Sequence, residues 1–298
     1  MANVRTMRAD EVAQAVEWAA AEGWNPGHGD MHGFLAQDPE AFLMAEEGGR
    51  MRACISAARY GADFGFIGFY IAAPELRGQG LGMAVWRAGM ARLAGRRIGL
   101  DGVVAQQANY RKSGFSLAWN NARYVGAVAA GMALPSTASV PFERLVAYDA
   151  ACFGVARADF LRAWIAGPGR VALVLPGAGS PLPGASSVLP GAGFPSPGAG
   201  FPSPALRGFA VARPGREGAR VGPLFADDQA GAAALLAGLA AAIPGPLVLD
   251  VPEANPAAVA LAQAAGMLKV FETARMYVGA PPAMALEKVF GVTSLEFG

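Results

Sequence analysis

The first 125 residues alternate between short apolar runs and segments whose apolar positions recur at helical spacing. This alternation predicts an α/β unit, because strands bury continuous or alternate positions whereas helices bury one stripe. A strand and two helices open the unit, three strands follow one another, and helix, strand, helix and strand complete it. The predicted strands are residues 4–7, 42–45, 51–58, 66–72, 98–103 and 116–124, and the predicted helices lie near residues 11–22, 31–37, 81–94 and 109–113.

The second half repeats part of this order. Residues 220–242 predict a strand and then a helix, and residues 247–251 predict a buried strand before another helix at 256–265. Gly266-Met267 precedes Ala274-Arg275 by the same spacing that separates Gly114-Phe115 from Ala122-Arg123. A recurrence of this kind predicts a second copy of the first unit.

Composition shifts divide the chain. Residues 1–126 form the first predicted domain, the small-residue stretch 127–139 a connector, and residues 140–298 the second domain. Residues 176–204 are rich in Pro, Gly, Ala and Ser and contain a seven-residue duplication, so they bury too little apolar area to order themselves. They are predicted to be a flexible insertion. A Pro-rich docking segment is the alternative, but no PxxP pair with an arginine supports it.

Charge and cysteine content argue against several classes of protein. The net charge is +1, and no basic run or basic-aromatic alternation points to nucleic acid. The two cysteines lie far apart and outside any Cys/His cluster, so neither a disulfide framework nor a metal site is expected. Residues 229–249 carry no charge, but glycines and prolines interrupt them, so we expect a core helix and strand there and no membrane span. Residues 1–14 lack a signal-peptide pattern, and a cytoplasmic location is expected.

A glycine-rich turn lies between a predicted strand and a predicted helix, at Arg77-Gly78-Gln79-Gly80-Leu81-Gly82. Helix starts have unpaired N–H groups and the positive end of the macrodipole, so they bind phosphate. The turn has neither the Gly-Lys-Ser/Thr ending of a P-loop nor the G-x-G-x-x-G of a dinucleotide turn. It predicts an anion cradle of another kind; the alternative is a tight connection without a ligand.

The spacing R-x-x-G-x-G, formed by Arg77, Gly80 and Gly82, resembles the pyrophosphate loop of the GNAT superfamily of acyl-CoA-dependent N-acyltransferases. A second motif, from Tyr110 to Phe115, is similar to the Y-x-x-x-G-F ending of the fourth GNAT helix, although Gln106 and Gln107 replace the usual asparagine before it. The resemblance implies an α/β (α+β) fold with two tandem GNAT-like mixed-sheet domains. It implies that the cofactor acetyl-CoA contacts Tyr70, Ile71, Ala72, Arg77, Gly78, Gln79, Gly80, Leu81 and Gly82.

The second copy departs from the motif. At the corresponding turn, residues 222–228 have no arginine and one glycine, and Asp227 and Asp228 would repel a pyrophosphate. Ala262 stands where the tyrosine would be. The second domain is therefore expected to be degenerate and supporting, as in a bacterial GNAT subgroup with an atypical C-terminal acetyltransferase-like domain.

The resemblance assigns chemistry to one side chain. It implies that Tyr110 lies beside the cofactor sulfur, and a phenol is close enough in acidity to protonate a departing thiolate, so Tyr110 is the predicted general acid. A tyrosine that only packs on the sheet is the alternative. An amine acceptor also needs a group to take its proton. The candidates in the acceptor loop are His28, Asp30 and His32, with Glu46 further off, although Asp30 is also placed to cap a helix.

These observations predict an enzyme, an acyl-CoA-dependent N-acetyltransferase that acts on a primary amine by direct attack in a ternary complex, without a metal. A non-catalytic acyl-CoA-binding sensor or scaffold is the alternative, and a regulator with an effector site in its second half is a third interpretation. The expected partner is a small-molecule or peptide amine. The sequence identifies neither this acceptor nor an oligomeric state.

Overall fold

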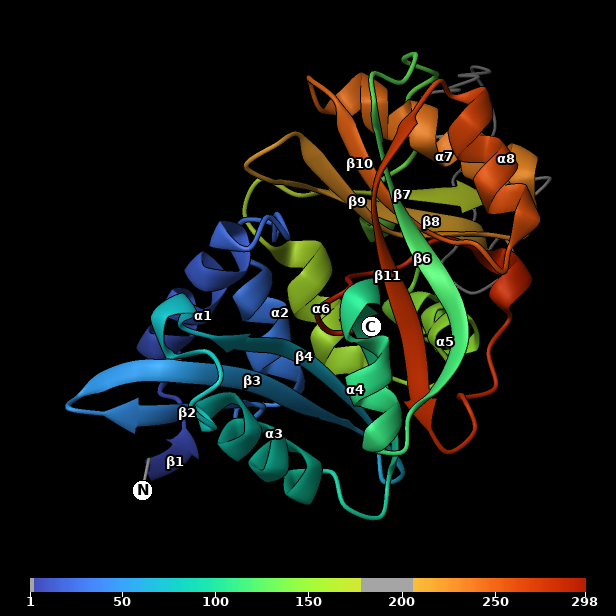
Figure 1. Cartoon of the computed structure of the whole chain (residues 1–298). Helices are drawn as coiled ribbons and strands as arrows, with labels where there is room; N and C mark the ends of the chain where they lie inside the picture. The colour runs from blue at the N-terminus through green and yellow to red at the C-terminus, as the bar shows by residue number, and fades with distance from the viewer. Residues whose placement is uncertain (1–2, 178–205) are drawn as a thin grey trace, which may run out of the picture.

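The computed structural model describes residues 3–177 and 206–298. The first half has the predicted order of strands and helices (Figure 1). The predicted flexible insertion begins at the end of a strand, and the rest of it, residues 178–204, lies outside the described residues. The elements of the first half are β1 (Asn3–Thr6), α1 (Ala9–Ala21), α2 (Asp30–Gln37), β2 (Phe42–Glu47), β3 (Arg50–Tyr60), β4 (Phe64–Ala72), α3 (Leu81–Arg92), β5 (Arg97–Val103), α4 (Gln107–Lys112) and β6 (Ser116–Gly126).

The second half repeats this order without the first strand. Short 3₁₀ turns occur at Pro74–Leu76, Val104–Gln106, Thr137–Ser139 and Leu286–Lys288. None of the helices in the described ranges is long and apolar enough to cross a membrane. The elements of the second half are α5 (Phe142–Phe153), α6 (Ala158–Ala166), β7 (Val171–Pro176), β8 (Leu206–Pro214), β9 (Ala219–Ala226), α7 (Gln229–Ala242), β10 (Leu247–Pro252), α8 (Pro256–Ala264), β11 (Leu268–Val278) and β12 (Val289–Gly291).

The two halves share one mixed sheet, in the order β1-β2-β3-β4-β5-β11-β6-β10-β9-β8-β7, with β12 beside β9. The last long strand of each half lies in the other half: β11 pairs with β5, and β6 pairs with β10. The predicted fold class is confirmed: the chain forms two tandem α/β units on a mixed sheet, with their last long strands exchanged. The boundary at residue 126 coincides with the end of β6 and stays a prediction as a domain boundary.

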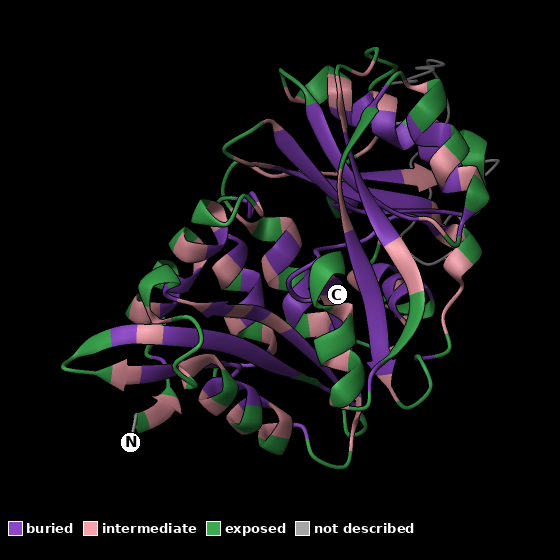
Figure 2. Ribbon diagram, in the orientation of Figure 1, coloured by how far each residue is buried: buried purple, intermediate pink, exposed green. Residues whose placement is uncertain are grey.

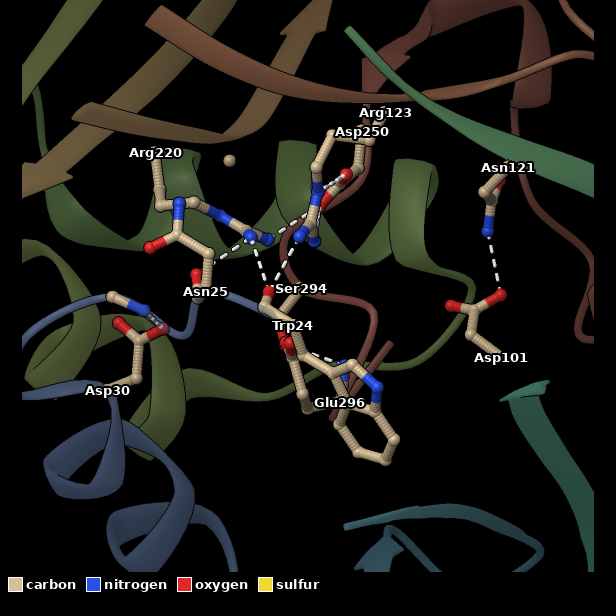
Figure 3. A network of polar contacts seen from close by, with 12 residues as sticks. Trp24, Asn25, Asp30, Asp101, Asn121, Arg123, Arg220, Asp250, Ser294 and Glu296 are labelled. Carbon is tan, nitrogen blue, oxygen red and sulfur yellow. Dashed lines mark hydrogen bonds and ion pairs between the residues drawn. The ribbon is translucent and has the colours of Figure 1, made fainter. Parts of the chain in front are cut away.

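Buried ion pairs accompany the exchange, and Figure 3 shows the one between Arg123 and Asp250. Arg275 of β11 donates to Asp101 of β5 over 2.8 and 2.5 Å, and Arg123 of β6 donates to Asp250 of β10 over 2.7 and 3.1 Å. Arg123 and Arg275 occupy equivalent positions of the repeat, as do the two aspartates. Each half therefore supplies one arginine and one aspartate to the other, in bidentate geometry.

Three hydrophobic cores pack on this sheet, whose strands are largely buried (Figure 2). One core is common to both halves and lies beneath α1, α2, α5 and α6. On the other face, α3 and α4 cover the first half and α7 and α8 cover the second. The exchange of strands extends to the cores, because Ala274 and Met276 of β11 pack with the first half and Ala122 and Tyr124 of β6 with the second.

A β-bulge in β4 changes which face its side chains occupy. The pairing with β3 shifts register between Cys54 and Ser56, and Phe69 at this point has φ +48°, a left-handed conformation that is rare outside glycine. Phe69 thereby packs in the common core together with Phe66, three residues earlier. The next side chain, that of Tyr70, therefore lies on the face covered by α3 and α4.

Candidate active site

A cavity of about 640 Å³ opens where β4 and β5 separate. The two parallel strands pair from Phe64 and Arg97 to Ile67 and Leu100, and each then continues without the other. The strand edge of β4 beyond Ile67 is thus free to pair with an extended ligand. The described residues that line the cavity are Glu22, Trp24, Ile67, Gly68, Phe69, Tyr70, Ile71, Ala72, Leu76, Arg77, Gly78, Gly80, Gly82, Met83, Trp86, Leu100, Asp101, Gly102, Val103, Ala105, Gln106, Tyr110, Phe271, Thr273, Leu295 and Glu296.

The predicted cradle forms one end of this cavity. Gly80 is the N-cap residue of α3, and Gly78 and Gly80 have φ values of +82° and +85°, so both need glycine. A Cβ placed on either would meet nothing within 4 Å, so the space over the helix start is open. No side-chain hydrogen bond caps α3, and its first N–H groups face this space.

The arginine of the cradle has a partner that lies far away in the sequence. The Nη2 atom of Arg77 forms an ion pair with Glu22, which follows the end of α1. The Nε of the same arginine donates to the carbonyl oxygen of Ala72 over 3.3 Å. Both charged side chains line the cavity and are partly exposed. The guanidinium at the cradle end is therefore paired with a carboxylate, which an anionic ligand would have to compete with.

Tyr110 lies in the same cavity, between the free ends of the strands and α3. Its ring packs 5.6 Å from that of Trp86 and lies against Gly102 of β5, where a Cβ would come within 2.2 Å of the ring. Burial raises the pKa of Tyr110 to about 12, and Tyr70 adds to this. Its hydroxyl makes no hydrogen bond to any described residue. The phenol therefore stays protonated at neutral pH and is available to donate.

The opposite end of the cavity is built mainly by residues of the second half. Thr273 of β11 and Glu296 of the last segment line it, each with 4% of its surface exposed, alongside Phe271 and Leu295. Glu296 accepts a 2.6 Å hydrogen bond from Ser294 through Oε2, whereas its Oε1 and the Thr273 hydroxyl have no partner among the described residues. No sequence motif marked these residues. The exchange of β11 brings Phe271 and Thr273 to the first half, and the segment after β12 brings Leu295 and Glu296.

The other predicted site residues are distributed as follows. Tyr70, Ile71, Ala72 and the turn residues line the cavity, except Gln79 and Leu81. His28 is exposed, and neither His28 nor Asp30 lines the cavity. Asp30 is buried and accepts from Arg213 over 2.8 Å, from Arg170 over 3.1 Å and from the N–H of Gly27 over 2.9 Å. The geometry gives Asp30 a structural role. In the described part of the chain, no group of three or more His, Cys, Asp or Glu residues could hold a metal ion.

Both halves of the chain are similar to proteins of a known family. The model of the Acetyltransferase (GNAT) family matches residues 9–130, and that of an Acetyltransferase (GNAT) domain matches residues 202–291. The chain belongs to the GNAT superfamily. A relative, the holothin acyltransferase of Pseudoalteromonas sp. (strain SANK 73390), is 28% identical over 95% of this chain and 90% of its own.

Two solved structures share the fold of this GNAT protein along nearly its whole length. A putative acetyltransferase from Pyrococcus horikoshii superposes with a TM-score of 0.77 at 17% identity, over 99% of this chain and 95% of its own. A tandem GNAT protein from the clavulanic acid biosynthesis pathway has a TM-score of 0.58 at 16% identity, over 94% of this chain and 99% of its own. The tandem arrangement is thus found in other proteins.

In the second half, the cleft that corresponds to the cavity between β4 and β5 is closed by the chain itself. Like β4 and β5, strands β9 and β10 pair in parallel over a few residues, from Ala219 and Leu247 to Val221 and Leu249. Beyond this point β12 pairs antiparallel with β9, and the N–H of Val292 donates to the carbonyl of Asp250 on β10 over 2.9 Å. The place that stays open between β4 and β5 is therefore occupied by protein.

Proposed function

We propose that this GNAT protein transfers an acyl group from acyl-CoA, with acetyl-CoA the first candidate, to a primary amine. The observation that carries this proposal is the single cavity in which an uncapped helix start, a free strand edge and an unpaired phenol meet. Pyrophosphate would bind the N–H groups around Gly80 and the guanidinium of Arg77. The extended pantetheine arm would pair with the edge of β4 between Tyr70 and Ala72.

Direct attack in a ternary complex fits the side chains present. The amine nitrogen attacks the thioester carbonyl, a backbone N–H near Tyr70 stabilises the developing oxyanion, and the sulfur leaves with the proton of Tyr110. Neither cysteine lines the cavity, and burial raises the pKa of both thiols, that of Cys54 to about 12. A thiol that stays protonated is a poor nucleophile, which disfavours an acyl-enzyme.

The name of the 28% identical relative suggests which acceptor amines to test first. The protein that is 28% identical is named as an acyltransferase of holothin, so amines related to holothin belong in the first substrate panel beside polyamines, aminoglycosides and peptide N-termini. Since the acceptor end is lined by Trp24 and Phe271 as well as by Glu296, we expect acceptors that combine an apolar body with an amino group.

The proposed function is tested with one protein sample. Acetyl-CoA binding is measured by isothermal titration, and thiol release is then followed with the amine panel. Binding with thiol release supports the transferase. Binding without release from the whole panel supports the acyl-CoA sensor instead, and absence of binding contradicts the assignment of the cavity.

Tyr110→Phe examines the mechanism. The ring stays in its packing, so acyl-CoA should bind as before, while turnover falls by about 100-fold because the acid is missing. Tyr148→Phe is the matched control, since this tyrosine bonds Asp227 and the carbonyl of Arg207 outside the cavity. Equal turnover in the two variants would remove Tyr110 from the mechanism.

A further inference from the structure

A carboxylate from the last segment of the chain points to how the acceptor amine loses its proton. We propose that Glu296 is the general base of the reaction and binds the amino group of the acceptor. This inference rests on the proposed function and adds a catalytic residue to it. Glu296 lines the cavity at the end opposite the cradle, and its Oε1 is buried without a hydrogen-bond partner among the described residues. A buried carboxylate oxygen of this kind favours a donor with positive charge.

The other carboxylates of the cavity are already engaged. Glu22 is at the cradle end and pairs with Arg77. Asp101 accepts from Asn121 over 2.7 Å and from Arg275 over 2.8 Å through Oδ1, and again from Arg275 over 2.5 Å through Oδ2. Among the described lining residues, Glu296 is therefore the buried carboxylate that keeps an oxygen for a ligand, whereas Glu22 is partly exposed and lies beside the cradle arginine.

The segment that carries Glu296 is held firmly against the first half. The hydroxyl of Ser294 accepts from the N–H groups of Glu296 and Phe297 over 3.0 and 3.2 Å. The ring of Phe297 stacks on Phe34 with 4.1 Å between centroids, and Tyr60 donates to the carbonyl of Phe297 over 2.7 Å. These contacts fix the carboxylate in one position, as a base requires.

Two further features fit the segment to this place. A Cβ on Gly68 of β4 would lie 1.9 Å from the carbonyl oxygen of Glu296, so the segment crosses the strand where glycine leaves room for it. Thr273 lies at the same end of the cavity, and its hydroxyl also lacks a partner in the described part of the chain. The second half thus offers two polar groups, one anionic and one neutral, to a single acceptor.

The charges around Glu296 come from several elements (Figure 3). Arg123 and Arg220 share Asp250 with each other and both donate to the carbonyl of Trp24, so two guanidinium groups meet one carboxylate there. The pair of Asp101 with Arg275 is neutral as a unit, and Tyr110 stays protonated. Arg123, Arg220 and Asp250 together carry one net positive charge beside Glu296. No described arginine pairs directly with Glu296, so its free Oε1 is the negative group that remains for an alkylammonium acceptor.

The proton count of the reaction closes with these two residues. Acylation of an alkylammonium removes two protons from its nitrogen. Glu296 takes the first before the attack and later releases it to solvent. The N–C bond then forms, the C–S bond breaks, and the sulfur leaves with the bonding electrons and the proton of Tyr110. The second proton of the nitrogen restores that of Tyr110.

Glu296→Gln tests the proposal, because the amide keeps the size of the side chain and an oxygen that accepts from Ser294. At pH 7 we expect kcat/KM for an alkylamine to fall by about 100-fold, with acetyl-CoA affinity unchanged. The deficit should shrink as the pH rises toward about 10, where the free amine needs no base, and should be small at pH 7 for an amine with a pKa below 7. Glu253 is a carboxylate at the surface that pairs with Lys269, so Glu253→Gln is the control variant and should keep full activity.

The outcomes separate the two proposals. Wild-type protein that binds acetyl-CoA but acylates no amine overturns the proposed function and the general base with it. Wild-type protein that is active while Glu296→Gln is equally active, or is reduced by the same factor at every pH and with every amine, overturns the general base alone. If Glu296→Gln does not fold, Glu296→Asp is measured instead. It should show a smaller deficit with the same pH dependence, and a deficit independent of pH would contradict the proposal.

Discussion

The two helix starts of the repeat show how one fold makes an anion site in one half and removes it in the other. In the first half the N-cap residue of α3 is Gly80, and nothing covers the helix start. In the second half the N-cap residue of α7 is Asp228, whose carboxylate accepts from the N–H of Gly231 over 2.7 Å and pairs with Arg207. That hydrogen bond lowers the pKa of Asp228. In the second half a carboxylate occupies an N–H group of the helix start and would repel a phosphate, whereas the uncapped helix of the first half is available to one.

The position of the phenol differs between the halves in the same way. Tyr110 packs against Gly102, which follows Asp101 on β5. The equivalent residues of the second half are Ala262 on α8 and Val251, which follows Asp250 on β10 and is buried. A large and a small side chain have exchanged places, so the packing is kept while the acid is lost.

The largest expected effect is a loss of stability when an ion pair that joins the two halves is broken. Asp250→Asn leaves Arg123 and Arg220 buried without the carboxylate that pairs with both, and we expect the free energy of unfolding to fall by about 3–5 kcal/mol in urea titrations. Burial raises the pKa of Asp250, but the two arginines outweigh it and the net shift is downward. A lowered pKa stabilises the fold above the unfolded pKa, so the deficit should be complete above about pH 4 and vanish as the pH falls through the lowered pKa.

Asp63→Asn is the control for that variant, because its pair with Arg97 is at the surface and should contribute at most about 1 kcal/mol. A loss of similar size in both variants would mean that the exchanged ion pairs do not hold the two halves together.

Gly80→Asp gives the first half the acidic cap of the second. The carboxylate would occupy the helix N–H groups and repel pyrophosphate, so acetyl-CoA affinity should drop by at least about 100-fold, or roughly 2.7 kcal/mol. Asparagine has the same shape as aspartate and tolerates the positive φ equally well, but it carries no charge. Gly80→Asn should therefore lose clearly less affinity for acetyl-CoA than Gly80→Asp. Titration calorimetry compares the two; intact binding by Gly80→Asp would place the phosphate site elsewhere.

Gly102→Val and Tyr110→Ala together copy the second half. Gly102→Val alone should cost about 1–3 kcal/mol of unfolding free energy, because the new methyl groups collide with the Tyr110 ring. The double variant should recover part of that loss, with a coupling energy of about 0.5–3 kcal/mol in urea denaturation. Additive effects of the two substitutions would show that the residues do not compensate one another.

Glu22→Gln has the smallest expected effect. It frees Arg77 and removes a negative charge from the cradle end, so acetyl-CoA should bind up to about fivefold more tightly, and less so at high salt. Glu75 lies just before the same turn and is exposed, so the control variant Glu75→Gln should leave the affinity for acetyl-CoA unchanged. Weaker binding by Glu22→Gln would indicate that Glu22 positions the arginine rather than competing for it.

Local features of this protein could be predicted from its sequence. The cradle, the helix that carries Tyr110, and the acidic turn of the second half depend on residues close together in the chain, where glycine and cap preferences decide the backbone. The exchange of strands could not be predicted. The side chains of β6 and β11 show nearly the same order of exposed and buried positions, so either strand satisfies either sheet position.

The same limit applies to the site. Glu22 and Glu296 reach the cavity from segments far from the motif, and neither stands in a recognisable pattern. Phe69 adopts a positive φ that its residue type disfavours, and only tertiary packing in the common core makes it acceptable. The acceptor loop was predicted from the resemblance at His28 and Asp30, whereas the cavity ends at residues that the second half supplies.

The most direct test of the difference between the halves is the stoichiometry of acetyl-CoA binding, measured by isothermal titration of the wild-type chain, Gly80→Asp and Asp228→Gly. One site per chain is expected in the wild-type protein, none in Gly80→Asp, and still one in Asp228→Gly, because β12 fills the second cleft. Two sites in the wild-type chain, or one that survives in Gly80→Asp, would contradict the assignment of acyl-CoA to the first half.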